Sequence, residues 1–104
     1  MKVGIIGLGL IGGSISLKLK EVNNDITVYG FDKNNQSLDF SLSKQIIDYK
    51  LDLESLLDFD YLFLAIPVES IKSQLASILD KISERTLVID FGSTKYQICN
   101  SVGK

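Results

Sequence analysis

Three glycines near the start of the chain, Gly7, Gly9 and Gly12, have the spacing G-x-G-x-x-G. Glycine allows a tight turn, and a backbone without a Cβ atom lets a phosphate group approach closely. The N–H groups of Leu10, Ile11 and Gly12 would open a helix, whose unpaired donors and positive dipole end attract anions. This segment therefore predicts a site for the pyrophosphate of a dinucleotide, and the alternative is a turn whose glycines serve packing alone.

An acidic residue, Asp32, lies twenty residues after Gly12, at the end of a second apolar run. A carboxylate in this position can accept hydrogen bonds from both hydroxyls of a ribose, and it would repel a 2′-phosphate. The position therefore predicts NAD as the cofactor, with NADP less favoured, although Lys33 beside it weakens the preference. The alternative is that Asp32 only ends a strand.

The elements that must position these residues alternate along the chain. Strands that are apolar throughout are typical of a parallel sheet covered on both faces. We therefore predict one α/β domain over residues 1–104, a Rossmann-type doubly wound parallel sheet of five strands, order 3-2-1-4-5, with helices on both faces. The predicted strands are 2–6, 26–31, 46–48, 61–66 and 86–91, and the predicted helices begin at 10, 34 or 35, 68, and 93 or 94 and end near 22, 44, 83 and 102.

Apolar residues at helical spacing predict which side of each helix faces the sheet. One or two helical turns are also predicted over residues 52–57. The residues predicted to face inward are Ile11, Ile15, Leu19 and Val22 in the first helix, Leu38 and Leu42 in the second, and Ile71, Leu75, Ile78, Leu79 and Ile82 in the third.

Composition excludes several classes of protein. The net charge is −2 and the lysines are scattered, which argues against a nucleic-acid surface. The apolar runs are too short to span a membrane, and the first strand begins without a signal peptide, so a cytoplasmic location is expected. Cys99 is the only cysteine, which leaves no internal disulfide. No metal site is predicted.

The chain contains no histidine. Histidine is the commonest general base near neutral pH, so the usual proton acceptor of an enzyme is missing from these residues. Lys18, Lys20 and Tyr96 have no motif around them that would suggest an alternative base. The sequence therefore predicts cofactor binding more strongly than proton chemistry.

Four short motifs occur in order along the chain: "GLGLIGGS" (7–14), "VYGFD" (28–32), "LAIPV" (64–68) and "DFGSTK" (90–95). Together they resemble the N-terminal, NAD-binding domain of the prephenate and arogenate dehydrogenase family, over nearly the whole chain. Each motif alone would also fit other β-hydroxyacid-type dehydrogenases. Such a relative, or a stand-alone nucleotide-binding module, is therefore the alternative.

The resemblance implies oxidation and decarboxylation of prephenate to 4-hydroxyphenylpyruvate in tyrosine biosynthesis, with hydride transfer to NAD. It implies that Ala65, Ile66 and Pro67 line the cofactor and that Ser93 lies beside the nicotinamide and the substrate hydroxyl, although Ser93 could instead cap a helix. The family's catalytic histidine, its substrate arginines and its helical dimerisation domain are expected beyond Lys104. A fragment of this kind would bind the cofactor without turnover, and the intact protein is expected to be a homodimer that acts on prephenate or arogenate.

Overall fold

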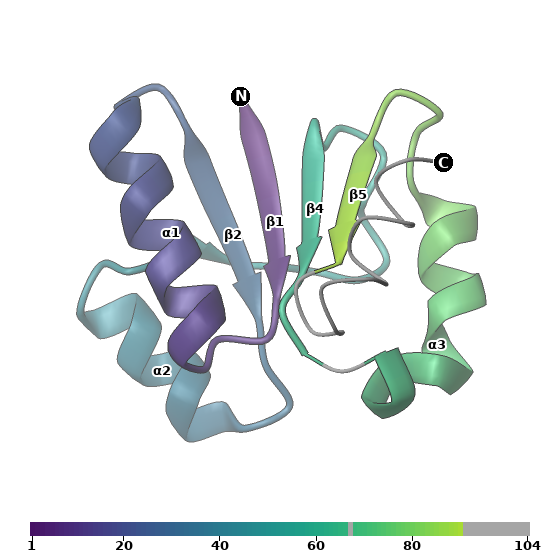
Figure 1. Cartoon of the computed structure of the whole chain (residues 1–104), viewed down its shortest axis with the longest axis horizontal. Coiled ribbons are helices and arrows are strands. Elements are labelled where there is room, and N and C mark those ends of the chain that lie inside the picture. The colour runs from purple at the N-terminus through teal and green to yellow at the C-terminus, as the bar shows by residue number, and fades with distance from the viewer. Residues whose placement is uncertain (67, 91–104) are drawn as a thin grey trace.

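A single parallel sheet forms the centre of the computed structural model, which describes residues 1–66 and 68–90. Its strand order is β3-β2-β1-β4-β5, and every neighbouring pair is parallel, which confirms the predicted topology. The carboxyl ends of the strands therefore meet at one edge of the sheet, the lower edge in Figure 1. The strands are β1 (Lys2–Ile6), β2 (Thr27–Phe31), β3 (Tyr49–Lys50), β4 (Tyr61–Leu64) and β5 (Leu87–Asp90).

The helices within the described residues pack against the sheet, and they are α1 (Leu10–Val22), α2 (Asn35–Ser43) and α3 (Val68–Lys81). Successive residues of a strand point to opposite faces, so Ile5 and Ile6 of β1 belong to two different apolar clusters. Helices α1 and α2 contribute to the cluster around Ile5, and α3 contributes Ile78 to the cluster around Ile6. The helices thus cover both faces of the sheet, as the sequence predicted.

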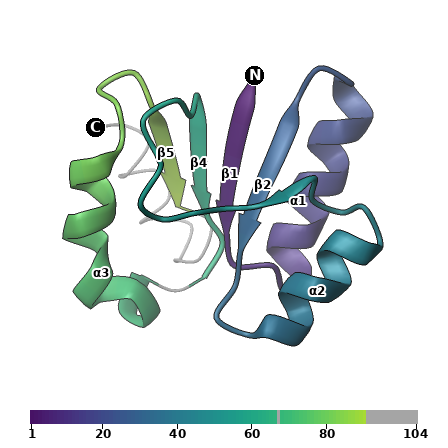
Figure 2. The ribbon, with the colours of Figure 1, turned by 180° about the vertical axis from the view of Figure 1, so that it is seen from behind.

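The segment between β3 and β4 completes the cover on the side of α3. Figure 2 shows this segment crossing the sheet without forming a helix. Its buried side chains Leu51, Leu56 and Phe59 join the cluster around Ile6. The helical turns predicted over residues 52–57 are therefore wrong; a hydrogen-bonded turn closed by Ser55 N and Asp52 O at 3.0 Å lies there instead.

The third strand was predicted at residues 46–48 but consists of Tyr49–Lys50. The apolar residue Ile47 is buried before the strand begins. Asp48 N donates to Val28 O at 2.9 Å, and Val28 N donates to the Asp48 carboxylate, also at 2.9 Å. The Asp48 side chain thus accepts the hydrogen bond from Val28 N that a backbone carbonyl of β3 would accept in a regular sheet. We attribute the later start of β3, at Tyr49, to this substitution.

The buried side of α1 also differs from the prediction. Ile15 and Leu19 pack on the core, but Ile11 and Val22 are 51% and 71% exposed. The buried side is instead turned toward Ser16, which is fully buried and donates from Oγ to Ile46 O. Leu79 of α3 is likewise exposed, whereas Leu38, Leu42, Leu75, Ile78 and Ile82 face the core as predicted. The side chain of Ile71, also predicted to face inward, lies outside the described part of the structure.

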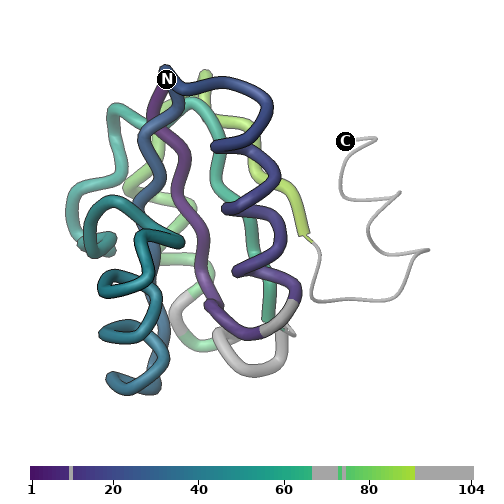
Figure 3. The backbone as a smooth tube through the Cα atoms, turned by 90° about the vertical axis from the view of Figure 1, so that its left-hand side faces the viewer, coloured from purple at the N-terminus to yellow at the C-terminus, as the bar shows by residue number. Residues whose placement is uncertain are grey.

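The remaining element ends agree with the predictions to within two residues, and residue 91, the predicted end of the last strand, lies outside the described residues. The helix predicted from residue 93 or 94 to residue 102 lies outside the described residues. In Figure 3 the chain runs down β1, turns sharply and returns along α1. The glycine segment forms this turn, at the edge where the strands end.

Candidate functional site

The fold itself requires two of the three motif glycines. Gly7 has a φ of +102°, which side-chain-bearing residues rarely adopt, and a Cβ atom there would lie 2.4 Å from Ile66 Cγ2. A Cβ atom on Gly12 would lie 1.8 Å from Gly7 O. Gly7 therefore makes the turn out of β1, and Gly12 lets α1 pack directly on that turn.

Gly9 differs from the other two because nothing in the fold requires a glycine there. Its φ of −75° and ψ of −156° are extended backbone that any residue adopts. A Cβ atom on Gly9 would meet no heavy atom of residues 1–66 and 68–90 within 4 Å. The backbone at Gly9 is thus exposed to open space, where a ligand could approach it as closely as the motif predicts.

The first turn of α1 begins beside this open backbone. Gly9 is the N-cap residue, and among the described residues no side chain caps this end of the helix. Its first turn holds no acidic residue, so nothing there opposes the positive end of the helix dipole. Leu10, Ile11 and Gly12 form this first turn, where backbone N–H groups have no carbonyl partner within the helix. This arrangement suits an anion such as a pyrophosphate.

Asp32 lies where β2 ends, facing the glycine turn. Its Oδ2 accepts a hydrogen bond from Leu8 N at 2.7 Å, and its Oδ1 accepts one from Asn34 N at 2.8 Å. The side chain is half-buried. An ionised carboxylate offers about four lone-pair positions, so Asp32 can still accept hydrogen bonds from a ligand.

A hollow of about 180 Å³ opens between the ends of β1, β2 and β4. Asp32 and Gly7 form part of its wall, so the structure brings together the acid and the turn that the sequence predicted to act jointly. Ile66 also lines it, whereas Ala65 packs instead beneath the helix start, 3.4 Å from where a Gly12 Cβ would be. The residues that line the hollow are Ile6, Gly7, Phe31, Asp32, Lys33 and Ile66.

Two predicted site residues, Pro67 and Ser93, lie outside the described residues. In the other direction, sequence reasoning missed Leu8, whose amide bonds to Asp32, and the apolar contributions of Ile6 and Phe31 to the hollow. Both apolar residues end strands that run parallel and in register, Ile6 opposite Phe31. The predicted topology could have located them, because such strand ends meet at one edge.

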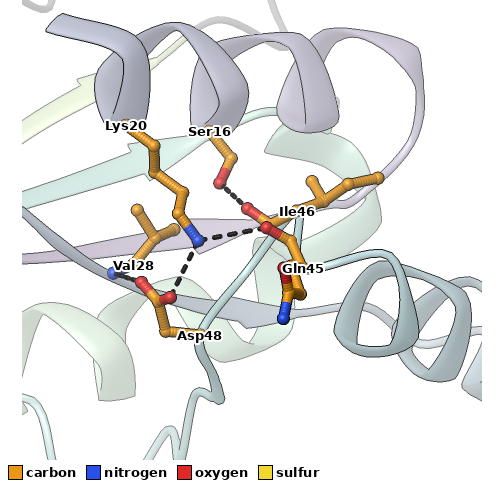
Figure 4. Close-up of polar contacts among 6 residues, drawn as sticks. All are labelled: Ser16, Lys20, Val28, Gln45, Ile46 and Asp48. Atoms are coloured by element: carbon orange, nitrogen blue, oxygen red, sulfur yellow. Dashed lines mark hydrogen bonds and ion pairs between the residues drawn. The ribbon is translucent and has the colours of Figure 1, made fainter. Parts of the chain in front are cut away.

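A second group of polar residues ties α1 to the segment that precedes β3 (Figure 4). Lys20 Nζ donates to Gln45 O at 3.0 Å and to Asp48 Oδ1 at 2.8 Å. Burial alone would raise the pKa of Asp48, but the hydrogen bonds from Lys20 and Val28 and the Lys20 charge outweigh it, so the pKa lies below its ordinary value of 3.8. These groups satisfy one another, and we assign them a structural role.

In residues 1–66 and 68–90, no three His, Cys, Asp or Glu side chains are grouped so that they could hold a metal ion. None of the helices described is both long enough and apolar enough to cross a membrane. The glycine turn and the adjoining hollow are therefore the site to which the sequence motifs and the geometry both point.

Comparison with known sequences identifies relatives of this chain. The family model described as prephenate dehydrogenase, nucleotide-binding domain, matches residues 15–104. The chain is 33% identical over 99 residues to a prephenate dehydrogenase of Lactococcus lactis, and 30% identical over 97 residues to one of Bacillus subtilis. These matches take in 93% and 90% of this chain but only 28% and 26% of the two relatives, so the chain spans about a quarter of their length.

Solved structures agree with the sequence relatives. Synechocystis arogenate dehydrogenase superposes with a TM-score of 0.80 and 27% identity, over 99% of this chain and 37% of that one. The prephenate dehydrogenase of A. aeolicus, in complex with hydroxyphenyl propionate and NAD+, gives a TM-score of 0.77 and 31% identity, over 100% of this chain and 39% of that one. By its family match and its fold, the chain belongs to the nucleotide-binding domain family of the prephenate dehydrogenases.

Proposed function

We propose that this chain binds NAD at the glycine turn and the adjoining hollow. The observation that carries the proposal is the contrast among the motif glycines, since Gly9 alone is not required by packing and has open space above it. The start of α1, which no side chain of the described part of the chain caps, lies at the same place. A phosphate-binding role accounts for both features, which a turn whose glycines serve packing alone would not need.

In this proposal the cofactor lies across the carboxyl edge of the sheet. Its pyrophosphate contacts the backbone at Gly9 and the N–H groups of Leu10, Ile11 and Gly12. The adenosine ribose bonds to Asp32, which lines the hollow. Ala65, Ile66 and Pro67, which follow β4, line the cofactor on its other side. No residue of the chain forms a covalent bond to the cofactor in this arrangement.

The preference for NAD over NADP rests on Asp32. Its carboxylate would lie against a 2′-phosphate, and the repulsion between two anions in a half-buried hollow is unfavourable. Lys33 lines the same hollow and can reduce this repulsion. We therefore expect NADP to bind more weakly than NAD without being fully excluded.

For the intact protein we propose the activity of a prephenate or arogenate dehydrogenase, consistent with the two solved relatives of those names. The bound nicotinamide would accept a hydride from the substrate, and Ser93 would lie beside it. The 104 residues contain no histidine, so the proton acceptor would come from another part of the protein. A helical substrate and dimerisation domain, a homodimer and a cytoplasmic location complete the proposal.

Calorimetric titration of the chain with NAD and, separately, with NADP tests cofactor binding. We expect saturable binding of NAD, weaker binding of NADP, and no reduction of NAD when prephenate or arogenate is added. If a folded sample binds neither nucleotide at millimolar concentration, the proposal is wrong. For the intact activity, the complete reading frame is expressed and NADH formation is followed with each substrate; no NADH from either one contradicts the assigned reaction.

A further inference from the structure

We infer that Asp32 is a positioning residue for the pyrophosphate site, in addition to contacting the ribose. The inference rests on the proposed nucleotide site and extends it. It states that the Asp32 carboxylate holds the backbone of the glycine turn in the shape that exposes Gly9. Loss of Asp32 would then weaken binding of the diphosphate itself, even for a ligand that has no ribose hydroxyl to bond.

The first evidence is that two successive N–H groups of the turn are held by the end of β2. Gly7 N donates to Phe31 O at 2.7 Å, and Leu8 N donates to Asp32 Oδ2, also at 2.7 Å. The first bond belongs to the backbone and any residue at 31 could supply it. The second depends on the side chain at position 32, so a substitution there can remove it.

The second evidence is the position of Leu8 itself. Its side chain is 6% exposed and belongs to the core cluster, so this residue is fixed from both its side chain and its amide. Gly9 follows directly and has no side chain that could anchor it. The Gly9 carbonyl accepts from Gly13 N of α1 at 2.9 Å. The direction in which the Gly9 backbone faces is therefore set by α1 on one side and by Leu8 on the other, and Leu8 is oriented by Asp32.

The third evidence is that the other carboxylate oxygen reaches toward α2. Asn34 N donates to Asp32 Oδ1 at 2.8 Å, and the Asn34 side chain caps α2 by accepting from Gln36 N and Ser37 N. One carboxylate thus connects the end of β2, the glycine turn and the start of α2. Two fixed backbone donors orient the carboxylate, which leaves its remaining lone pairs in a defined direction for a ribose.

This arrangement has a consequence for cofactor specificity. If Asp32 contacted only the ribose, replacing it with a small neutral residue would remove repulsion and favour NADP. Because Asp32 also holds the turn, we expect Asp32→Ala to weaken binding of NAD and NADP alike. A change of preference toward NADP would then require a substitution that keeps an acceptor for Leu8 N.

The test compares two ligands on the wild-type chain and on Asp32→Ala. ADP carries both ribose hydroxyls, and 2′,3′-dideoxy-ADP carries neither, so only the diphosphate and the adenine of the second can report a change. We expect Asp32→Ala to lower the affinity for dideoxy-ADP by about tenfold, the size of one charge-assisted hydrogen bond. An unchanged or higher affinity for dideoxy-ADP, with a loss confined to ADP, would overturn the inference.

A second measurement needs no ligand and separates this inference from the proposed function. In the free protein the Leu8 amide should exchange with solvent at least about tenfold faster in Asp32→Ala than in wild type, with Asp32→Asn between them, because asparagine offers one oxygen where aspartate offers two. Equal Leu8 exchange in all three proteins would overturn the inference even if NAD binds. If wild type binds no nucleotide, the proposed function is wrong. The exchange rate of the Leu8 amide then decides by itself whether Asp32 holds the glycine turn.

Asp39→Ala is the matched control. It removes the same charge from a side chain of α2 that is 72% exposed and lies 3.8 Å from Lys50 Nζ. We expect it to leave the Leu8 exchange rate and both ligand affinities as in wild type. Thermal unfolding of every variant confirms that the chain is folded at the temperature of the titrations.

Discussion

The two halves of α1 differ in whether their polar groups are bonded to the rest of the protein. Its second half is bonded to the segment before β3. Ser16 donates to a backbone carbonyl of that segment, and Lys20 donates to another carbonyl and to the Asp48 carboxylate. Its start has a glycine N-cap and an exposed backbone at Gly9. Polar groups that the protein satisfies itself hold the fold together, whereas donors left facing open space are available to a ligand.

The motif glycines repeat this contrast within six residues. Gly7 and Gly12 are explained by contacts of the protein with itself, and Gly9 is not. A sequence motif can therefore mix positions kept for folding with positions kept for binding. Substitutions at the first kind of position should lower the stability of the fold, and substitutions at the second kind should lower the affinity for NAD.

The largest effect is expected from Gly12→Ala. The added Cβ would overlap Gly7 O at 1.8 Å, and because the obstacle is backbone, α1 must move away from the turn. Overpacking of this severity should cost about 3 kcal/mol or more in the free energy of unfolding. For a domain of this size the melting temperature should fall by more than about 12 °C. A melting temperature within a few degrees of wild type would contradict the packing role.

Gly9→Ala should show the reverse behaviour. The methyl group meets open space, so the melting temperature should change far less than in Gly12→Ala. The same methyl group would stand between the backbone and the pyrophosphate, and we expect NAD affinity to fall about tenfold or more. Calorimetry and thermal unfolding on one sample measure both quantities. Unchanged affinity would mean that the phosphate does not lie over Gly9.

A smaller effect, on the free energy of unfolding, concerns the contact between the second half of α1 and Asp48, and it depends on pH. Because the folded pKa of Asp48 lies below 3.8, its contribution to stability is present above that pH and is lost as the pH falls through the lowered folded value. Asp48→Asn should therefore cost about 1 kcal/mol at pH 7, and the difference from wild type should shrink below about pH 4. Urea unfolding at several pH values measures it.

Asp39→Asn provides the comparison for that series. Its carboxylate pairs with Lys50 at 3.8 Å, and both side chains are more than half exposed, so the pair should contribute little. We expect its unfolding curve to follow wild type closely at pH 7. NAD affinity should be unchanged in Asp48→Asn, since Asp48 pairs with Lys20 in the second half of α1, away from the proposed site. A loss of affinity in that variant would contradict the division of α1 into two roles.

Much of the fold could be predicted from the sequence, because apolar runs and breaks along the chain are local signals. The alternation of strands and helices, the strand order and the start of α1 at Leu10 were all predicted and confirmed. The predictions failed where a side chain substituted for backbone or where packing overrode periodicity. Asp48 shifted β3, and the burial of Ser16 turned α1 so that Ile11 and Val22 became exposed.

The sequence by itself determined the glycine spacing, the acid after the second strand and the absence of histidine, since these depend only on residue type and order. The glycine spacing and the acid predicted the dinucleotide site, and the four motifs carried the family resemblance, which the family match confirmed. Only the tertiary structure decided which glycine faces open space, because that depends on atoms brought from Ile66 and Ala65. It also brought Leu8 N within 2.7 Å of Asp32, a contact across twenty-four positions that no local pattern encodes.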